Sequence, residues 1–285
     1  MTTGTGRASG KLILVGEHAV VHGEPALAFA VDRGTTVHLA SVDGPTTVDL
    51  PSVDPRLQAA VEHVVGPTGW RVSLSSDLPV GRGMGSSASL AVALVRAHDD
   101  ATGAHTDAYA RALEVERLFH GTPSGVDVAV AVAGGVLRFQ RTDPPTRQSL
   151  PAPSWQAVVL DSGSAGDTGA LVAAVGARRP GIDPQLRRIG ELVEAAQQAL
   201  DDPQALGPLL DENQALLEAI GVSTPRLEAL VGLARRHGAL GAKLSGAGGG
   251  GVVLALVDDP APLLAAAASE GVDAWVVRPA PGAPA

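Results

Sequence analysis

The sequence predicts an α+β protein of two domains. Segments typical of helices and strands follow one another without the regular alternation of a β-α-β protein. Of the 285 residues, 45% are hydrophobic, which is enough to bury a sizeable core. Only 2% are aromatic, so Ala, Val and Leu must fill that core. The Pro-rich stretch 143–153 is the best candidate boundary, and it divides the chain into domains 1–152 and 153–285.

Hydrophobic periodicity and turn residues place the elements of the first domain. Gly103 and Gly121 end two of its helices, and Thr106 is a candidate N-cap. We expect strands at 11–16, 37–42, 46–50, 72–76 and 135–141, and helices at 55–65, 86–101 and 106–120.

The same patterns place the elements of the second domain. Thr224 followed by Pro225 is typical of a helix start. We expect the tail 279–285 to be disordered. The expected strands are 156–161, 252–257 and 274–277, and the expected helices are 168–177, 184–200, 207–220, 224–238 and 261–269.

Composition excludes several classes of protein. The absence of cysteine rules out disulfides, cysteine zinc sites and cysteine nucleophiles. A formal net charge of −9 argues against general nucleic-acid binding, although a pocket for ATP needs only local positive potential. No apolar run reaches transmembrane length, and residues 1–10 lack the apolar core of a signal peptide. We therefore expect a cytoplasmic protein that does not bind membranes.

The stretch LPVGRGMGSSAS is the most informative motif. Gly81, Gly83 and Gly85 alternate with other residues, and Ser86 and Ser87 then open an Ala/Leu/Val-rich helix. Glycines let backbone N–H groups turn inward, and the helix start adds unpaired N–H groups and a positive dipole end. The motif therefore predicts a site for an anion such as a nucleotide phosphate. The alternative is an ordinary Gly-rich turn with a serine as helix N-cap.

Two carboxylates are candidates for chemistry. On a helix, Glu114 neighbours two arginines and fits a solvated face, whereas Glu116 lies on the mainly apolar face. A carboxylate that points inward must be paired, protonated or bound to metal, and an ordinary pairing with Arg or His stays open. Asp127 follows the turn Pro123-Ser124-Gly125, which could present a carboxylate rigidly or simply start the next helix.

The third motif is KLSGAGGGG at residues 243–251. Residues 246–251 match the G-x-G-x-x-G dinucleotide fingerprint, which needs a strand before it and a helix after it. Here we expect a helix upstream and the strand 252–257 downstream, which argues against a nicotinamide oxidoreductase. A loop packed against a ligand or the first Gly-rich loop is the better interpretation, and a flexible hinge is the alternative.

Near the N-terminus, the segment GKLILVGEHAVVHG places three polar residues at the ends of a predicted strand. Lys11 could lower the pKa of a hydroxyl or bind a carboxylate, and Glu17 and His18 could form hydrogen bonds in a pocket. A surface lysine and ordinary turn residues are the alternative. The P-loop and the protein-kinase signatures are absent from the sequence.

Together these motifs resemble the GHMP kinase superfamily of small-molecule kinases, and most of all its mevalonate kinases. The resemblance runs from Lys11 to Val257 in the order of that family. Ser245 stands where threonine is commoner. The matching segments are the loop 79–88, GEHAVVHG at 16–23, HGTPSGVD at 120–127 and the third motif at 243–251.

The resemblance implies a two-domain GHMP kinase fold. Its N-terminal domain would be like ribosomal protein S5 domain 2 and its C-terminal domain ferredoxin-like, with the active site in the cleft between them. It also implies ATP and Mg²⁺ as cofactors, with Ser87 and Glu116 as metal ligands. The residues implied to bind the ATP phosphates are Gly81, Gly83, Gly85, Ser86, Ser87 and Ala88.

By the same resemblance, Asp127 would accept the proton of the C5 hydroxyl of mevalonate, and Lys11 would favour the alkoxide. The family is often dimeric, so the resemblance is compatible with a homodimer and leaves the oligomeric state open. The residues implied to contact the acceptor are Lys11, Glu17, His18, Asp127, Thr168, Gly246, Ala247 and Gly248.

Two other functions stay open at this point. Another GHMP kinase would phosphorylate phosphomevalonate, homoserine or a sugar. A phosphorylated acceptor needs extra basic residues, and the sequence shows no obvious basic cluster beyond Lys11 and Lys243. A non-catalytic ATP-binding sensor would lack the base or the metal ligand, but Asp127, Glu116 and Lys11 are all present.

Overall fold

The computed structural model describes residues 1–121 and 123–282, and the chain forms two compact units. Each unit draws on several stretches of chain, and the domain boundary near residue 152 stays a prediction. Unit 1 comprises Met1–Gly10, Arg33–Val80 and Gly85–Ala133, and unit 2 comprises Lys11–Asp32, Gly81–Met84 and Gly134–Ala285.

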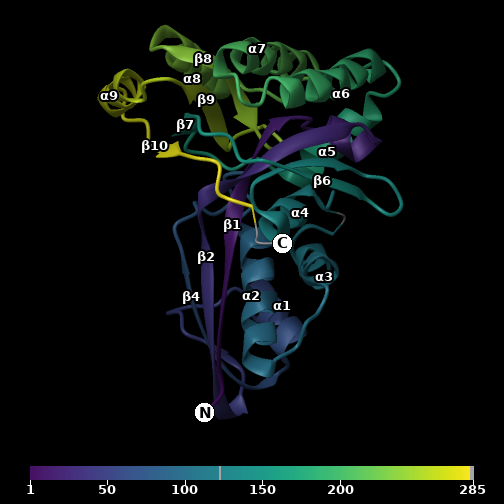
Figure 1. Cartoon of the computed structure of the whole chain (residues 1–285), viewed down its shortest axis with the longest axis vertical. Helices are drawn as coiled ribbons and strands as arrows, with labels where there is room; N and C mark the ends of the chain where they lie inside the picture. Colours follow the sequence, from purple (N-terminus) through teal and green to yellow (C-terminus); the bar gives the residue numbers. More distant parts are fainter. Residues whose placement is uncertain (122, 283–285) are drawn as a thin grey trace. The chain divides into compact units, whose positions relative to one another are not determined.

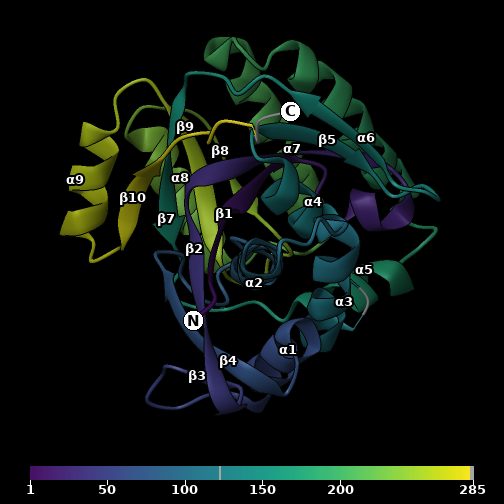
Figure 2. The ribbon, with the colours of Figure 1, turned by 60° about the horizontal axis from the view of Figure 1, so that its bottom comes forward.

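Unit 1 is a small sheet covered by helices. Its elements are β1 (Thr3–Val15) and β2 (Pro25–Pro45), which both continue into unit 2, with β3 (Thr47–Val48), β4 (Thr68–Ser76), α1 (Pro55–Val65), α2 (Ser86–Thr102), α3 (Ala108–His120) and α4 (Val126–Ala133). The second half of β2 pairs antiparallel with β4, and β3 pairs parallel with β4. Helices α1, α2 and α3 lie on one side of β2 and β4 (Figures 1 and 2).

Small residues let the first strand of unit 1 approach helix α2. A Cβ atom added to Gly4 would lie 2.2 Å from the carbonyl oxygen of Ala97, and one added to Gly6 would lie 2.0 Å from that of Ala93. The strand therefore fits only without side chains at these positions. The expected start of this strand at residue 11 was therefore wrong. Strand β1 begins at Thr3, because glycines occupy the buried face of this polar segment.

Unit 2 contains an antiparallel four-stranded sheet in the order β10-β7-β9-β8. Helices α7 and α8 pack on β8, and α9 lies beside β10 (Figure 2). The first half of β2 pairs with β5, which pairs with β6. The elements are β5 (Val136–Gln140), β6 (Thr146–Leu150), β7 (Gln156–Asp161), β8 (Ala239–Ser245), β9 (Val252–Val257), β10 (Ala274–Val277), α5 (Thr168–Ala177), α6 (Asp183–Gln198), α7 (Pro203–Ala219), α8 (Pro225–Arg236) and α9 (Ala261–Ser269).

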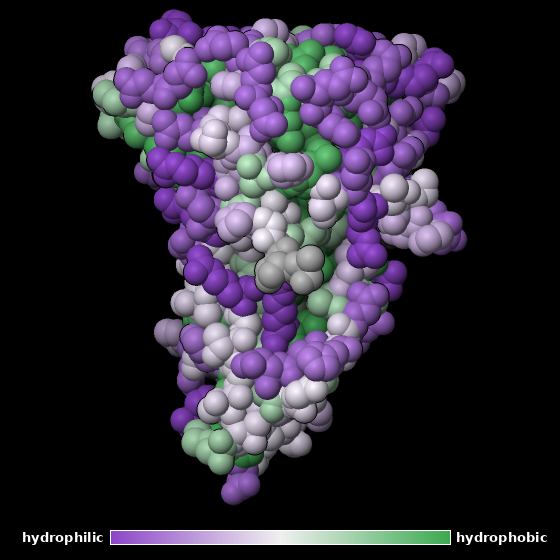
Figure 3. All heavy atoms as spheres, in the orientation of Figure 1, coloured by the Kyte–Doolittle hydropathy of each residue, from purple (hydrophilic) through white to green (hydrophobic). Residues whose placement is uncertain are grey.

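Helix α6 is amphipathic. It buries Leu186, Ile189, Leu192 and Val193 and turns charged residues outward. Hydrophilic side chains accordingly gather over the region of α6 and α7 in Figure 3. Among the described residues, no helix is both long enough and apolar enough to cross a membrane.

The α+β prediction is confirmed, and three helices have the expected bounds: α1, α5 and α9. The predicted first residues of two helices were wrong, because an aspartate that we did not identify caps each of them. Asp107, not Thr106, accepts N–H groups at the start of α3, and Asp202 does so at the start of α7. Gly207 therefore lies inside α7, where a Cβ atom would meet the Leu240 carbonyl oxygen at 2.3 Å.

Two strands, β6 and β8, were not predicted from the sequence. Strand β6 lies inside the Pro-rich stretch. Strand β8 lies between the expected upstream helix and the glycine run, and its last three residues, 243–245, begin the third motif. The dinucleotide fingerprint thus does follow a strand, but β9 rather than a helix comes after it, so the fold is still not the dinucleotide-binding one. Disorder of the tail was also wrong for residues 279–282, because Pro279 and Gly282 form bridges to Val31 and Gly134; residues 283–285 lie outside the described residues.

Candidate functional site

The first and third Gly-rich motifs meet in unit 2. A Cβ atom on Gly83 would lie 3.1 Å from the carbonyl oxygen of Ser245, and one on Gly251 would lie 3.0 Å from that of Arg82. On the other side of the third motif, a Cβ atom on Gly166 would lie 2.0 Å from the carbonyl oxygen of Gly248. The third motif is therefore a tightly packed loop, and the alternative of a flexible hinge is wrong.

The first motif has the backbone that its glycines allow. Gly81, Gly83 and Gly85 have φ values of 72°, 77° and 69°, which only glycine adopts readily. Gly85 occupies the N-cap of α2, and no side chain caps the helix. The serine N-cap alternative is therefore wrong. The first amide groups of α2 have no acceptor within the helix, which is the arrangement that binds anions.

An ion pair ties the first motif to the end of β7. The Arg82 Nε atom donates to Asp161 at 2.9 Å, and the second carboxylate oxygen of Asp161 accepts the N–H of Gly163 at 2.8 Å. Asp161 thereby connects the loop 81–84 with the turn that leads towards α5. Thr168, predicted to contact the acceptor, is exposed at the first position of α5, and Asp167 caps that helix.

Unit 1 brings the two predicted metal ligands to one histidine. His120 Nε2 lies 3.1 Å from the Ser87 hydroxyl and 3.9 Å from the Glu116 carboxylate. Glu116 is 2% exposed, whereas Glu114 is exposed and pairs with His63 at 3.2 Å. The predicted faces of α3 are therefore confirmed.

The donor set at this point suits magnesium. A hydroxyl and a carboxylate are hard oxygen ligands, and Mg²⁺ is commonly held by one or two carboxylates together with substrate phosphates. Among the described residues, no group of three or more His, Cys, Asp or Glu side chains is placed to hold a metal ion. Asp127 is half-buried in the first turn of α4, just after Gly125 with φ 88°.

Lys11 is 3% exposed and lies within β1, so its interpretation as a surface residue at a strand end is wrong. Its ammonium donates to the carbonyl oxygen of Gly83 at 3.0 Å, and its backbone N–H donates to that of Met84 at 2.9 Å. Lys11 therefore attaches β1 to the first Gly-rich loop and brings a positive charge beside it.

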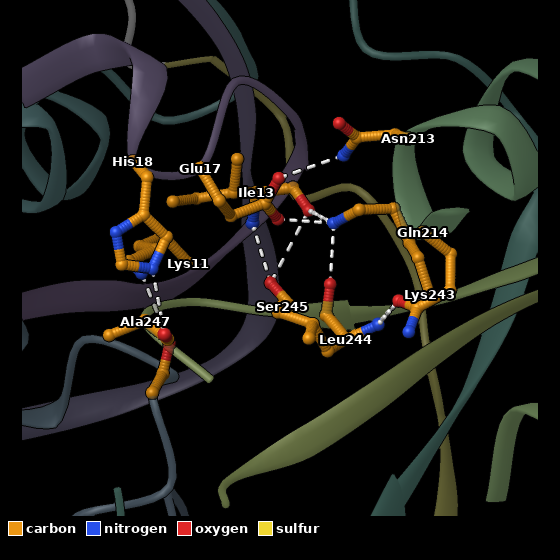
Figure 4. A network of polar contacts seen from close by, with 11 residues as sticks. Lys11, Ile13, Glu17, His18, Asn213, Gln214, Lys243, Leu244, Ser245 and Ala247 are labelled. Atoms are coloured by element: carbon orange, nitrogen blue, oxygen red, sulfur yellow. Dashed lines mark hydrogen bonds and ion pairs between the residues drawn. The ribbon is translucent and has the colours of Figure 1, made fainter. Parts of the chain in front are cut away.

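Glu17 is part of a buried polar network in unit 2 (Figure 4). One of its carboxylate oxygens accepts from Lys243, and the other accepts from Asn213 at 3.0 Å. Glu17, Lys243 and Asn213 are at most 1% exposed. From the sequence we noted Lys243 as part of the third motif and as a basic residue, but we did not foresee this pairing.

His18 is held beside the third motif in a strained turn. Its φ and ψ are 59° and −46°, and the N–H of Ala19 donates to the Glu17 carbonyl oxygen at 2.6 Å. This is the γ-turn with positive φ, which is rare and strained for a residue with a side chain. The imidazole Nε2 bonds the carbonyl oxygen of Ala247 at 2.8 Å, as Figure 4 shows.

The protonation of His18 follows from its surroundings. Burial lowers its pKa, and the charge of Arg178 and the neighbouring His22 lower it further, against the Ala247 bond and Glu17. The ring is therefore neutral at pH 7, with the proton on Nε2 because a carbonyl oxygen can only accept. Among the described residues, Nδ1 is buried and has no hydrogen-bond partner.

Three arginines supply positive charge that we did not anticipate. Arg179 and Arg141 lower the pKa of His22, after the larger effect of burial, and Arg178 acts on His18. Arg179 also lies 3.4 Å from the His22 ring and pairs with Asp183 at 2.6 Å.

Comparisons with known proteins decide the family. Residues 56–135 match the family model of the GHMP kinases N terminal domain, and residues 187–273 match that of the GHMP kinases C terminal region. The chain belongs to the GHMP kinase family. Within that family, its similarity to a mevalonate kinase of Pyrococcus abyssi is 35% identity over 295 residues, covering 87% of both chains.

Two further relatives in the GHMP kinase family are also mevalonate kinases. The chain is 34% identical to a mevalonate kinase of Methanothermobacter thermautotrophicus, which covers 87% of this chain and 88% of the relative. Among solved structures, an L. major mevalonate kinase in complex with R-mevalonate superposes with a TM-score of 0.84 and 27% identity, covering 97% and 96% of the two chains. The predicted resemblance to this family, and to its mevalonate kinases, is confirmed.

Proposed function

We propose that this chain transfers the γ-phosphoryl group of ATP to the C5 hydroxyl of mevalonate and so forms 5-phosphomevalonate. The observation that carries the proposal is the buried Lys11, whose ammonium lies on the Gly83 carbonyl of a loop built to bind phosphate. A cation at that point can serve both the transferred group and the acceptor hydroxyl. The similarity to mevalonate kinases over most of the chain supports the choice of acceptor.

Backbone amides bind the phosphates in this proposal. The positive-φ glycines let N–H groups face one side of the loop, and the uncapped start of α2 adds further donors. Because these donors belong to the backbone, their positions do not depend on flexible side chains. The residues proposed to bind the phosphates are Gly81, Gly83, Gly85, Ser86, Ser87 and Ala88.

Ser87 and Glu116 are the proposed magnesium ligands. The metal, when bound, supplies positive charge to the β- and γ-phosphates. The Ser87 hydroxyl and the Glu116 carboxylate both lie near His120, so a single ion could contact them after a modest movement of that exposed ring.

Asp127 accepts the proton of the attacking hydroxyl, and Lys11 stabilises the alkoxide that results. Glu17, His18, Thr168 and the loop 246–248 form the acceptor pocket. His18 is suited to a hydroxyl: its neutral ring offers a lone pair on Nδ1, and a buried acceptor without a partner gains most when a ligand donates to it.

We further propose that the protein acts in the cytoplasm on a small molecule, without nucleic acid or membrane, and that it is compatible with a homodimer. Its net charge of −9 and the family's small-molecule chemistry support this view.

Release of ADP with different acceptors tests the function. Purified protein with Mg-ATP is offered mevalonate, 5-phosphomevalonate, homoserine and galactose in parallel. Turnover confined to mevalonate is the expected result. Turnover on another acceptor would move the substrate assignment within the family, and bound ATP without turnover on any of them would favour a sensor.

Replacement of Ser87 by alanine is expected to weaken the use of Mg-ATP by about 1–3 kcal/mol, the scale of one lost polar contact. The half-buried side chain leaves little cavity, so stability should change little. Initial rates at varied Mg-ATP measure the effect. An unchanged Mg-ATP dependence would remove Ser87 from the set of metal ligands.

A pH profile tests the role of His18. Because burial lowers the pKa of His18, kcat/KM for mevalonate should begin to fall at a lower pH than an ordinary histidine would cause, as protonation of Nδ1 removes the acceptor. The unfolded chain takes up this proton more readily, so folding stability also declines as pH falls through the lowered pKa.

The matched variant is His18→Asn, because asparagine tolerates positive φ and does not titrate. The part of the acid limb that protonation of His18 causes should be absent from its profile for mevalonate. If the acid limb persists unchanged in His18→Asn, another group causes it.

A further inference from the structure

Lys243 is an ammonium group enclosed entirely by protein. It is 0% exposed, and its three donor positions are matched by three acceptors: the Glu17 carboxylate, the carbonyl oxygen of Ile13 at 3.3 Å and that of Leu244 at 2.5 Å. These acceptors come from β1, the turn after it and β8. One side chain therefore joins segments more than 200 residues apart in sequence.

Such a pair is a poor source of stability. Removing two charges from water costs several kcal/mol each, and apolar residues of similar volume often serve the fold as well or better. Burial indeed lowers the pKa of Lys243, against the opposing effect of Glu17. The stability of the fold therefore does not explain why a buried Lys243–Glu17 pair is present.

The position of Glu17 offers that explanation. The next residue along the chain is His18, whose backbone adopts the strained positive-φ turn. Such a conformation persists only where its surroundings hold it. On one side, Lys243 and Asn213 fix the Glu17 side chain; on the other, the Ala247 carbonyl holds the imidazole. Relaxation of the turn would carry the ring away from Ala247.

We propose that Lys243 is a positioning residue for the acceptor: through Glu17 it holds the strained turn at His18 and so keeps the imidazole on the Ala247 carbonyl beside the acceptor pocket. This inference rests on the proposed function, because it assigns Glu17 an indirect role in acceptor binding. Both carboxylate oxygens of Glu17 are already engaged by Lys243 and Asn213, which agrees with a role through its neighbour.

A purely structural pair would behave differently from a positioning pair. Loss of one partner leaves a buried charge uncompensated, so both Lys243→Met and Glu17→Gln should lower Tm. The double variant Lys243→Met/Glu17→Gln buries no charge at this point, so it should recover most of that loss. If the pair serves only stability, activity should recover together with Tm.

The decisive measurement is steady-state kinetics of the double variant. We expect KM for mevalonate to remain raised by roughly 10- to 100-fold, the scale of a small misplacement of a binding group, while KM for ATP changes much less. The control makes the same replacements in the exposed pair Arg188–Glu212, as Arg188→Met/Glu212→Gln, and should leave both constants unaltered. Recovery of KM for mevalonate together with Tm would overturn the proposal.

Imidazole NMR provides a readout that does not depend on the acceptor. In nitrogen-15 spectra of the unmodified protein, with His18 assigned through His18→Asn, the ring should show an Nε2–H tautomer whose proton is protected from exchange. The double variant should lose that protection. Unchanged His18 signals would overturn the positioning role even if mevalonate is phosphorylated, whereas lost protection without turnover on mevalonate would count against the proposed function alone.

Discussion

Asp127→Asn is expected to lower kcat by roughly 100- to 10,000-fold, the range that general acid–base catalysis contributes. Asparagine has nearly the shape of aspartate and fits the first turn of α4, where Asp127 is half-buried. It cannot accept the proton of the acceptor hydroxyl. Since the nucleotide is bound by the glycine loop and the start of α2 in our proposal, ATP affinity should stay close to that of the unmodified protein.

Turnover and ATP binding must be measured on the same preparations of this variant, by ADP release and by calorimetry. Asp273→Asn is a suitable control, because Asp273 is an exposed aspartate of unit 2. Near-normal turnover of Asp127→Asn would refute the assignment of the base. Loss of ATP binding together with turnover would instead indicate a structural role for Asp127.

Glu116→Gln should raise the Mg²⁺ concentration needed for half-maximal rate by at least about tenfold, because an amide oxygen is a far weaker ligand for a hard cation than a carboxylate. The same change at Glu114 removes an equal charge from the same helix. Glu114, however, is exposed and pairs with His63. It should therefore leave the Mg²⁺ dependence unaltered.

The comparison between these two variants separates ligation from long-range electrostatics. Rates at saturating ATP and mevalonate, measured against free Mg²⁺, provide the half-maximal concentrations. Equal shifts in Glu116→Gln and Glu114→Gln would show that only the net charge of α3 matters. Thermal unfolding of both variants checks that the buried Glu116 side chain has been replaced without loss of the fold.

Local sequence patterns predicted the structure correctly where an element is periodic or has a recognisable cap. The inward face of Glu116 and the bounds of α1 follow from helix geometry and from caps that a sequence shows. The positive-φ glycines of the first motif likewise have a local cause, since only glycine suits that backbone. These features needed no knowledge of distant contacts.

Features that depend on distant contacts were missed. Gly4 and Gly6 occupy the buried face of β1. Their role is evident only once α2 packs against them. The pairing of Lys243 with Glu17 joins two segments that nothing local connects, so the sequence did not predict it. For the same reason, a surface lysine and an ordinary turn residue remained alternatives for Lys11 and Glu17, which are both buried. The acceptor-pocket residues and metal ligands still stand as predictions for the variants above to test.

The most direct test of the central claim is phosphorus NMR of the product formed from ATP and mevalonate. An ester on C5 places phosphorus next to a CH₂ group, so its proton-coupled signal should be a triplet. An ester on the tertiary C3 hydroxyl would have no proton on the attached carbon and would produce a singlet. A new triplet that forms in step with ADP would support transfer to the C5 hydroxyl, and a singlet, or ADP without any new ester, would contradict it.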